Sequence, residues 1–111
     1  MQIFPHRTIP EIGVDELARL IESGSVRILD VREDWEFRRG RVPGAVSLPL
    51  GRLTAQAAGL SRDKPYAVIC EHGNRSLAAT EYLLSQGFEG AASVRGGTIA
   101  WARTQRPLER D

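Results

Sequence analysis

The stretch "YAVICEHGNRSLAATEYLLSQG", residues 66–87, decides the fold of this 111-residue chain. Its first five residues form a short apolar run, which is typical of a strand covered on both faces. Residues 76–86 carry apolar side chains at helical spacing, and Gly87 predicts the end of that helix. Cys70, the only cysteine, therefore closes a buried strand, and the polar segment "EHGNRS" leads from it into a helix.

The rest of the chain repeats this alternation of strands and helices. Strands are expected at residues 26–31 and 45–48, and helices at 14–22, 50–60 and just after Gly96-Gly97, with a brief helical turn between the two strands. This alternation predicts a single α/β domain over residues 1–111, with a mainly parallel sheet. We expect its core at about residues 8–104 and a flexible, loosely held tail at residues 105–111.

Composition narrows the possible functions. The chain has 15 Lys and Arg against 14 Asp and Glu, so its net charge of +1 gives no reason to expect nucleic acid or a membrane surface as a partner. It contains no apolar run of about 20 residues and no secretory leader pattern, so a cytoplasmic location is expected. One cysteine cannot form an internal disulfide, and His6 and His72 show no metal-ligand spacing, so no metal site is expected.

The position of Cys70 favours a reactive thiol. Ligands of parallel α/β sheets bind beyond the carboxyl ends of the strands, and both Cys70 and residues 30–32 fall at such ends of the expected strands. A helix start and its loop N–H groups favour an anion, here a nucleophilic thiolate. Gly73 permits a positive φ that lets these N–H groups converge on one centre. Arg75 is expected to fork toward an anion or to brace loop carbonyls.

A free cysteine is often an inert core residue, because cysteine is among the most buried residue types. That interpretation would suit Cys70 if only "YAVI" preceded it and apolar residues followed. The polar segment that does follow it, with a glycine and an arginine, is not typical of a core. The sequence therefore favours a reactive role for the Cys70 thiol over a purely structural role in the core.

Three pieces of sequence together resemble a known family. They are "ILDVREDWEFRRGRVPGAVSLPL" at residues 28–50, "VICEHGNRS" at residues 68–76 and "VRGGTIAW" at residues 94–101. The first is similar to an Asp-x-Arg segment that continues through Glu-Phe, Gly and Pro-Gly-Ala. In this order and spacing, the pieces resemble the single-domain rhodaneses, the thiosulfate sulfurtransferase family, over nearly the whole chain.

The resemblance implies a rhodanese-like fold with a central, mainly parallel sheet of about five strands flanked by helices on both sides. It also implies that Cys70 is the nucleophile and carries the transferred sulfur as a persulfide, without a metal or an organic cofactor. Thiosulfate or another persulfide donor would load Cys70, and cyanide, an external thiol or a sulfur-acceptor protein would receive the sulfur. The implied active-site loop comprises Glu71, His72, Gly73, Asn74, Arg75 and Ser76 after the cysteine.

Supporting roles are expected for residues at the end of the strand at 26–31 and just beyond it. Asp30 and Arg32 match the Asp-x-Arg positions, and Arg32 is expected to pair with Glu36 or Asp34 and so hold the neighbouring loop. Three aromatic side chains are expected to serve in packing, namely Trp35, Phe37 and Trp101, although Trp35 is also placed to border the cleft.

Two loop residues bear on the sulfur donor. Glu71 follows the cysteine where a basic residue is common in such loops, and its charge should weaken the binding of dianionic thiosulfate. A less charged persulfide, or one delivered by a partner protein, then becomes the more attractive donor. His72 is either a pH-dependent cation over the site or a merely solvated loop residue.

Two other functions are compatible with this kind of sequence. A phosphatase or arsenate reductase of the cell-division-cycle phosphatase type shares the fold but needs five residues between cysteine and arginine, and only four separate Cys70 from Arg75. A non-catalytic rhodanese-like binding module usually lacks the cysteine, which is present here. The sequence therefore favours sulfur transfer over both alternatives.

Overall fold

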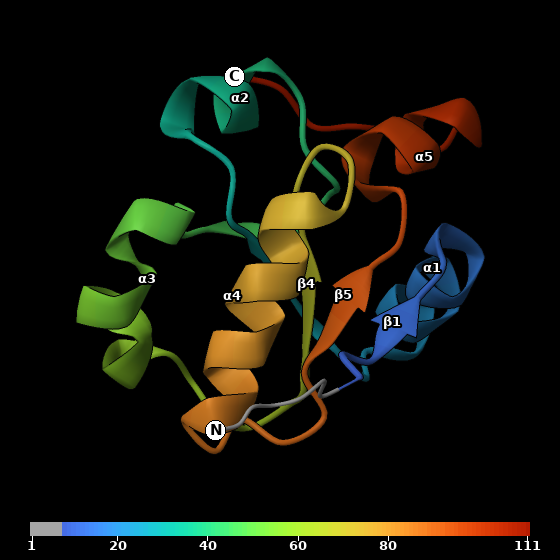
Figure 1. Cartoon of the computed structure of the whole chain (residues 1–111). Helices are drawn as coiled ribbons and strands as arrows, with labels where there is room; N and C mark the ends of the chain where they lie inside the picture. The colour runs from blue at the N-terminus through green and yellow to red at the C-terminus, as the bar shows by residue number, and fades with distance from the viewer. Residues whose placement is uncertain (1–7) are drawn as a thin grey trace.

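The computed structural model describes residues 8–111 and shows an α/β protein (Figure 1). The strands are β1 (Glu11–Ile12), β2 (Arg27–Asp30), β3 (Val46–Ser47), β4 (Tyr66–Ile69) and β5 (Ala92–Val94). The helices are α1 (Val14–Ser23), α2 (Asp34–Arg39), α3 (Leu50–Gln56), α4 (Asn74–Ser85) and α5 (Gly97–Arg103), with a 3-10 turn η1 (Ala57–Gly59) after α3. The interpretation of His6 and of the first seven residues lies outside the described residues.

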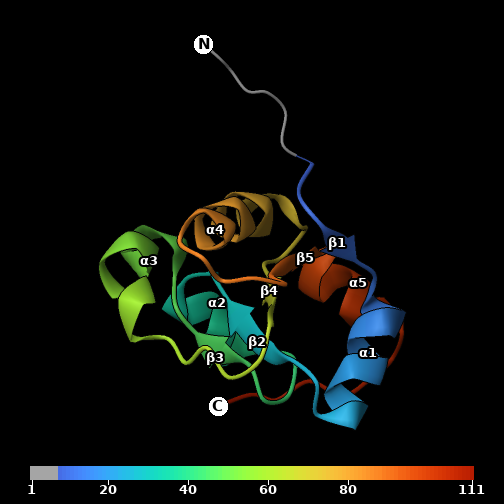
Figure 2. The same ribbon diagram turned by 90° about the horizontal axis from the view of Figure 1, so that it is seen from below.

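The five strands form one parallel sheet in the order β1-β5-β4-β2-β3. The central strands β2 and β4 pair over four residues each, from Arg27 with Tyr66 to Asp30 with Ile69. Helices α3 and α4 cover one face of the sheet, and α1 and α5 cover the other (Figure 2). The predicted parallel α/β sheet with helices on both sides is therefore confirmed.

Strand β4 shows how the sequence builds the two halves of the core. Successive side chains of a strand point to opposite faces, so a wholly apolar strand supplies both layers. Tyr66, Val68 and Cys70 pack against α3 and α4, whereas Ala67 and Ile69 pack against α1 and α5. All five residues are almost completely buried, which explains why "YAVIC" is apolar without alternation.

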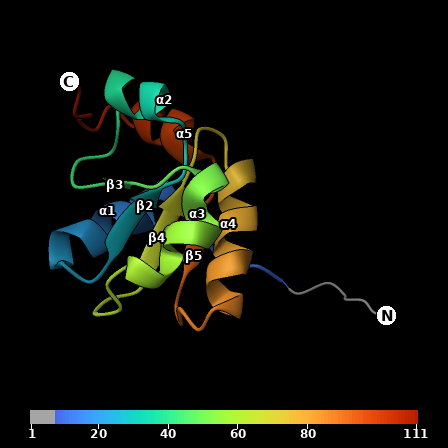
Figure 3. The same cartoon turned by 90° about the vertical axis from the view of Figure 1, so that its left-hand side faces the viewer.

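The carboxyl ends of the central strands meet at one edge of the sheet. Asp30 is the register partner of Ile69, so Cys70 begins its loop directly beside the residues that follow β2. The loop from β4 to α4 lies at the same end of the molecule as α2 and α5 (Figures 1 and 3). This arrangement brings three segments that are distant in sequence around one cysteine.

The C-terminal segment is held more closely than we expected. The Trp101 indole N–H donates to the Pro107 carbonyl at 3.0 Å, and Arg41 and Glu109 exchange two backbone hydrogen bonds of 2.9 Å. Leu108 packs against the core layer under α1 and α5. These contacts join residues 105–111 to the loop after α2 and to α5, in the segment for which the sequence predicts a loosely held tail.

The aromatic residues divide between core and surface. Trp101 is buried, as predicted, and Phe37 is half-buried with the Arg41 guanidinium 4.5 Å from its ring centroid. The packing role predicted for Trp35 is wrong, because 54% of this residue is exposed. Helix α2 has only six residues, and its inward face is occupied by Glu36, so Trp35 points away from the core.

No helix within residues 8–111 is long and apolar enough to cross a membrane.

Candidate active site

The Cys70 sulfur lies in a cradle of backbone N–H groups. The amides of Gly73 and Ser76 donate to Cys70 Sγ at 3.2 and 3.3 Å, and only 1% of the residue is exposed. Gly73 has a φ of 105°, which is unfavourable for other residues and turns the loop back over the sulfur before α4 begins at Asn74. The loop therefore presents the convergent donors that the sequence predicts, and such donors favour an anionic sulfur.

Two serine hydroxyls extend this network behind the thiol. Ser76 Oγ lies 3.5 Å from Cys70 Sγ and 2.7 Å from Ser93 Oγ, and both serines are fully buried. Ser76 belongs to α4 and was predicted as a loop residue of the site. Ser93 belongs to β5 and was missed, because a serine within "GAASV" carries no pattern that points to a cysteine 23 residues earlier.

A close approach of α5 holds the outside of the loop. The N–H groups of Thr98 and Ile99 donate to the carbonyls of Cys70 and Glu71 at 2.9 and 3.1 Å. A Cβ atom on Gly97 would overlap both of these carbonyl oxygens. The second glycine in "VRGGTIAW" is thus explained, since the backbone of α5 can contact the loop only without a side chain at Gly97.

Arg75 and Glu36 link α4 to α2. Arg75 Nη1 and Nη2 donate to the two carboxylate oxygens of Glu36 at 2.7 and 2.9 Å. The Arg75 guanidinium, with help from the Glu33 amide and against the effect of burial, lowers the pKa of Glu36 to about 2. The same hydrogen bonds raise the pKa of Arg75. The predicted fork is present, but it binds an internal carboxylate and braces no loop carbonyl.

Asp30 and Arg32 form a separate buried pair. The backbone and side-chain N–H groups of Arg32 donate to the Asp30 carboxylate at 2.7–3.1 Å, and Arg32 Nη2 also donates to the Gly40 carbonyl at 2.8 Å. The prediction that Arg32 pairs with Glu36 or Asp34 is wrong. Helix α2 begins at Asp34, so Arg32 precedes the helix and lacks the helical spacing that such a pair requires.

The remaining loop residues lie at the surface. Asn74 is exposed, and 64% of the His72 side chain is exposed, with His72 Nε2 3.3 Å from Glu71 Oε2. Glu71 and Glu36 line a shallow hollow of about 260 Å³ beside the loop, together with Arg32, Arg39, Gly40, Thr98, Ile99, Ala102 and Leu108. The side chain of Glu71 thus lies in a hollow beside the loop that follows Cys70.

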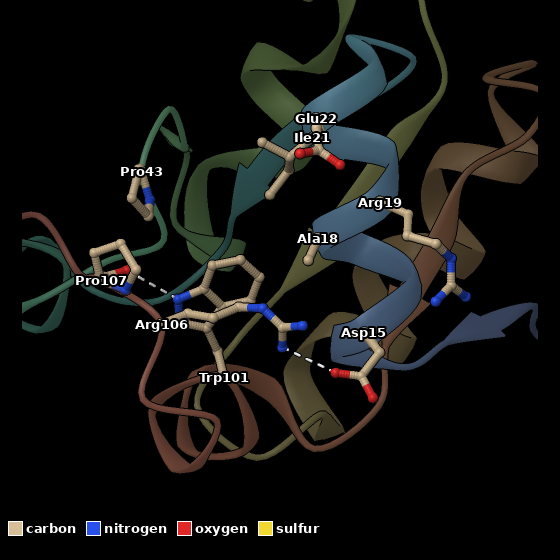
Figure 4. Close-up of a pocket in the computed structure, with 9 residues that line it drawn as sticks. All are labelled: Asp15, Ala18, Arg19, Ile21, Glu22, Pro43, Trp101, Arg106 and Pro107. Atoms are coloured by element: carbon tan, nitrogen blue, oxygen red, sulfur yellow. Dashed lines mark hydrogen bonds and ion pairs between the residues drawn. The ribbon is translucent and has the colours of Figure 1, made fainter.

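A second hollow, of about 670 Å³, lies between α1 and the C-terminal segment (Figure 4). The Trp101 indole forms its floor, and Arg106 crosses it to pair with Asp15 at 2.9 Å. None of the predicted site residues lines it. In residues 8–111, no group of three or more His, Cys, Asp and Glu side chains is placed to hold a metal ion.

The fold and the cradle define a parallel α/β protein with one cysteine seated at a strand-to-helix turn. The rhodanese-like domain family matches residues 13–104, so the chain belongs to the rhodanese-like family. The order of its helices and strands is that of the rhodanese-like fold.

Relatives and solved structures agree with this assignment. The chain is 33% identical to a sulfurtransferase of Allochromatium vinosum over 90% of its own length and 94% of the relative. It is 36% identical to thiosulfate sulfurtransferase GlpE of Shewanella oneidensis, covering 81% of this chain and 89% of that protein. Together with the family match, these relatives support sulfurtransferase activity in general.

Solved structures show the same fold. A rhodanese-related protein from Thermoplasma volcanium superposes with a TM-score of 0.84 at 36% identity, over 92% of this chain and 99% of that chain. A human single-domain sulfurtransferase superposes with a TM-score of 0.79 at 27% identity, over 89% and 100%.

Proposed function

We propose that this protein transfers a sulfane sulfur by way of a persulfide on Cys70. The observation that carries the proposal is the pair of N–H groups, from Gly73 and Ser76, that converge on the buried Cys70 Sγ. Sulfur transfer makes this atom anionic both before loading and after release. Preorganised donors stabilise such an anion without rearrangement during the reaction.

Loading of Cys70 is a displacement at sulfur. The Cys70 thiolate attacks the outer sulfur of thiosulfate, a new S–S bond forms, and the S–S bond of thiosulfate breaks with its electron pair leaving on sulfite. The products are a Cys70 persulfide anion and sulfite, so atoms and charge balance. The family relationship and the cradle support this step, and no metal or organic cofactor takes part in it.

Transfer of the sulfur from Cys70 to an acceptor is a second displacement at sulfur, in which Cys70 is the leaving group. A thiolate or cyanide attacks the outer sulfur of the persulfide, and the electron pair of the breaking S–S bond returns to Cys70 Sγ. The chain has no second cysteine, so the acceptor must be external. We propose cyanide, a small thiol or a thiol of an acceptor protein in this role.

The identity of the donor depends on Glu71. A relative of this chain is named a thiosulfate sulfurtransferase, which makes thiosulfate the first donor to test. Glu71 lines the hollow beside the loop, where its carboxylate would repel a dianion. We therefore propose that persulfides of lower charge are better donors than thiosulfate. Because the reaction needs a free thiol, a reducing compartment such as the cytoplasm suits the protein.

Surrounding residues keep the cradle in shape. The Arg75–Glu36 pair fixes the start of α4 against α2, and the Asp30–Arg32 pair fixes the turn after β2 by binding the Gly40 carbonyl. We propose scaffold roles for Asp30, Arg32 and Glu36, without direct contact with substrate.

A donor and acceptor panel tests the proposed function. Single-turnover incubation with thiosulfate should release about one sulfite per chain, and added cyanide should then yield an equal amount of thiocyanate. Cys70→Ser should release neither product. Small-molecule and protein-bound persulfides complete the donor arm, with transfer to external thiols as the readout. Hydrolysis of aryl phosphates without sulfur transfer would indicate a phosphatase, and inactivity with every donor would indicate a binding module.

A further inference from the structure

The strand register places a buried serine directly behind the reacting sulfur. Ser93 on β5 pairs with Val68 on β4, and Val68 faces the same core layer as Cys70. The Ser93 side chain therefore points toward α4, where its hydroxyl meets Ser76 Oγ at 2.7 Å. As a neutral thiol, Cys70 donates to Ser76 Oγ at 3.5 Å; once the thiol has lost its proton, a hydrogen bond between the same two atoms requires the Ser76 hydroxyl to donate to Sγ. Ser93 Oγ, Ser76 Oγ and Cys70 Sγ thus form one buried hydrogen-bonded chain.

Each serine hydroxyl has a single proton, and this limits the directions that the hydrogen bonds of this chain can take. Among residues 8–111, Ser76 Oγ is the one hydrogen-bond partner of the Ser93 hydroxyl. If Ser93 donates to Ser76, the Ser76 proton is directed to Cys70 Sγ, and both protons meet an acceptor. If the order is reversed, Ser76 donates to Ser93, and the buried Ser93 proton has no acceptor among these residues.

The arrangement that satisfies both hydroxyls requires the sulfur to accept a hydrogen bond. An anionic sulfur is the stronger acceptor, and a buried polar group without a partner is costly. The two serines therefore add a side-chain donor to the amides of Gly73 and Ser76 that already point at Sγ. Ser76 on α4 and Ser93 on β5 are both fully buried.

We propose that Ser93 is a positioning residue that acts through Ser76 to stabilise anionic sulfur on Cys70. This inference rests on the proposed function, in which Cys70 Sγ is anionic before loading and becomes anionic again when the persulfide S–S bond breaks. At that moment the electron pair of the S–S bond arrives on Sγ, and the Ser76 hydroxyl stabilises it while its proton stays on oxygen. Ser93 keeps that hydroxyl pointed at the sulfur.

The test measures the ionisation of Cys70 without any sulfur donor. The ultraviolet absorbance of the thiolate is recorded against pH for each protein, with the corresponding Cys70→Ala protein subtracted. At the pH where the wild-type cysteine is half ionised, Ser93→Ala should lower the ratio of thiolate to thiol about threefold, and Ser76→Ala about tenfold. Ser93→Thr, which keeps a hydroxyl, should retain the wild-type ratio.

The double variant separates positioning from a general structural effect. In a Ser76→Ala background, Ser93→Ala should cause no further loss, because the hydroxyl through which it acts is already absent. Ser47→Ala is the matched control: Ser47 Oγ is a buried hydroxyl without a hydrogen-bond partner within residues 8–111, and its removal should leave the ratio unchanged. Thermal unfolding of each variant verifies that it is folded.

Charged groups around the sulfur are the same in all these proteins. They are Arg75 on α4, Glu71 and His72 in the loop, and Glu36 on α2. If Ser93→Ala lowered the ratio of thiolate to thiol equally in the wild-type and the Ser76→Ala backgrounds, the inference would be overturned. An unchanged ratio in folded Ser93→Ala would overturn it as well. Because the absorbance needs no donor, these outcomes are distinct from a failure of sulfur transfer itself, which would appear as an unloaded wild-type protein.

Discussion

Arg75 on α4 and Glu36 on α2 form a forked ion pair, in which Arg75 Nη1 donates to Glu36 Oε1 and Nη2 donates to Oε2. Glu36 is buried, and its Oε1 also accepts from the Glu33 amide at the start of α2. One carboxylate therefore caps α2 and holds the start of α4. The arginine of the loop is a structural clamp, and its guanidinium is engaged before any substrate arrives.

This pair makes stability depend on pH in a defined window. The pKa of Glu36 is lowered to about 2 from an ordinary value of 4.5, so its contribution is complete above the ordinary value and is lost as the pH falls toward the lowered one. Wild-type protein should lose on the order of 2 kcal/mol more unfolding free energy than Glu36→Gln between about pH 5 and pH 2. Denaturant unfolding at a series of pH values measures this difference. The exposed Glu81→Gln is the control and should follow the wild type; a Glu36→Gln profile parallel to that of the wild type would contradict the assignment.

His72 should affect thiosulfate use in a pH-dependent way. His72 Nε2 lies 3.3 Å from Glu71 Oε2, so a protonated imidazole would offset that carboxylate. His72→Ala should therefore lower kcat/KM for thiosulfate more at about pH 6 than at about pH 8, by roughly two- to threefold at the lower pH. Arg75→Ala should cost more at both, because it leaves Glu36 without its partner. Equal losses for His72→Ala at the two pH values would remove this role for His72.

Glu71 should determine the preference between donors. Glu71→Gln removes one negative charge from the hollow beside the loop, so kcat/KM for thiosulfate should rise about three- to tenfold at low salt. Donors of lower charge should gain less, and the gain should shrink as salt is added. Glu89→Gln, which changes an exposed carboxylate distant in sequence from the loop, serves as the matched control. An unchanged ratio between the two classes of donor would show that Glu71 has no part in selection.

Gly97 should tolerate no side chain. Its φ is +61°, and a Cβ atom there would overlap the carbonyls of Cys70 and Glu71, so Gly97→Ala should lower the unfolding free energy by at least about 2 kcal/mol and impair sulfur loading. Gly51→Ala is the natural comparison, because Gly51 lies within α3 with open space around its Cα. That substitution should be neutral or stabilise by up to about 1 kcal/mol. Unfolding by urea separates the two cases, and a Gly97→Ala protein as stable as Gly51→Ala would refute the close contact between α5 and the loop.

Local sequence patterns predict the part of this site that one segment builds. The strand, the turn at Gly73 and the helix that follows are contiguous, so their apolar spacing and glycine are sufficient to place Cys70 at a strand end with N–H groups over it. The fold class can be predicted for the same reason, because the apolar pattern of each contiguous segment indicates its own strand and helix.

Contacts between distant segments are what the sequence does not show. Ser93 reaches Ser76 only because β5 pairs with β4 in a particular register, and a strand of three residues has no alternation to reveal its inward face. Arg32 was predicted to pair with Glu36 or Asp34, yet the bend after β2 turns Arg32 back onto Asp30. Glu36 instead binds Arg75, 39 residues away. These hydrogen-bond partners are determined by the packing of the sheet and its helices, and the spacing of residues in the sequence does not predict them.

The mass of the intact protein after incubation with a sulfur donor tests the central claim most directly. Wild-type protein treated with thiosulfate or a small persulfide, and then freed of excess donor, should gain the mass of one sulfur atom on the peptide that contains Cys70. Cyanide should remove that mass, and Cys70→Ser should never acquire it. A folded wild-type protein that gains no sulfur from any donor, or that gains it equally in Cys70→Ser, would contradict the account.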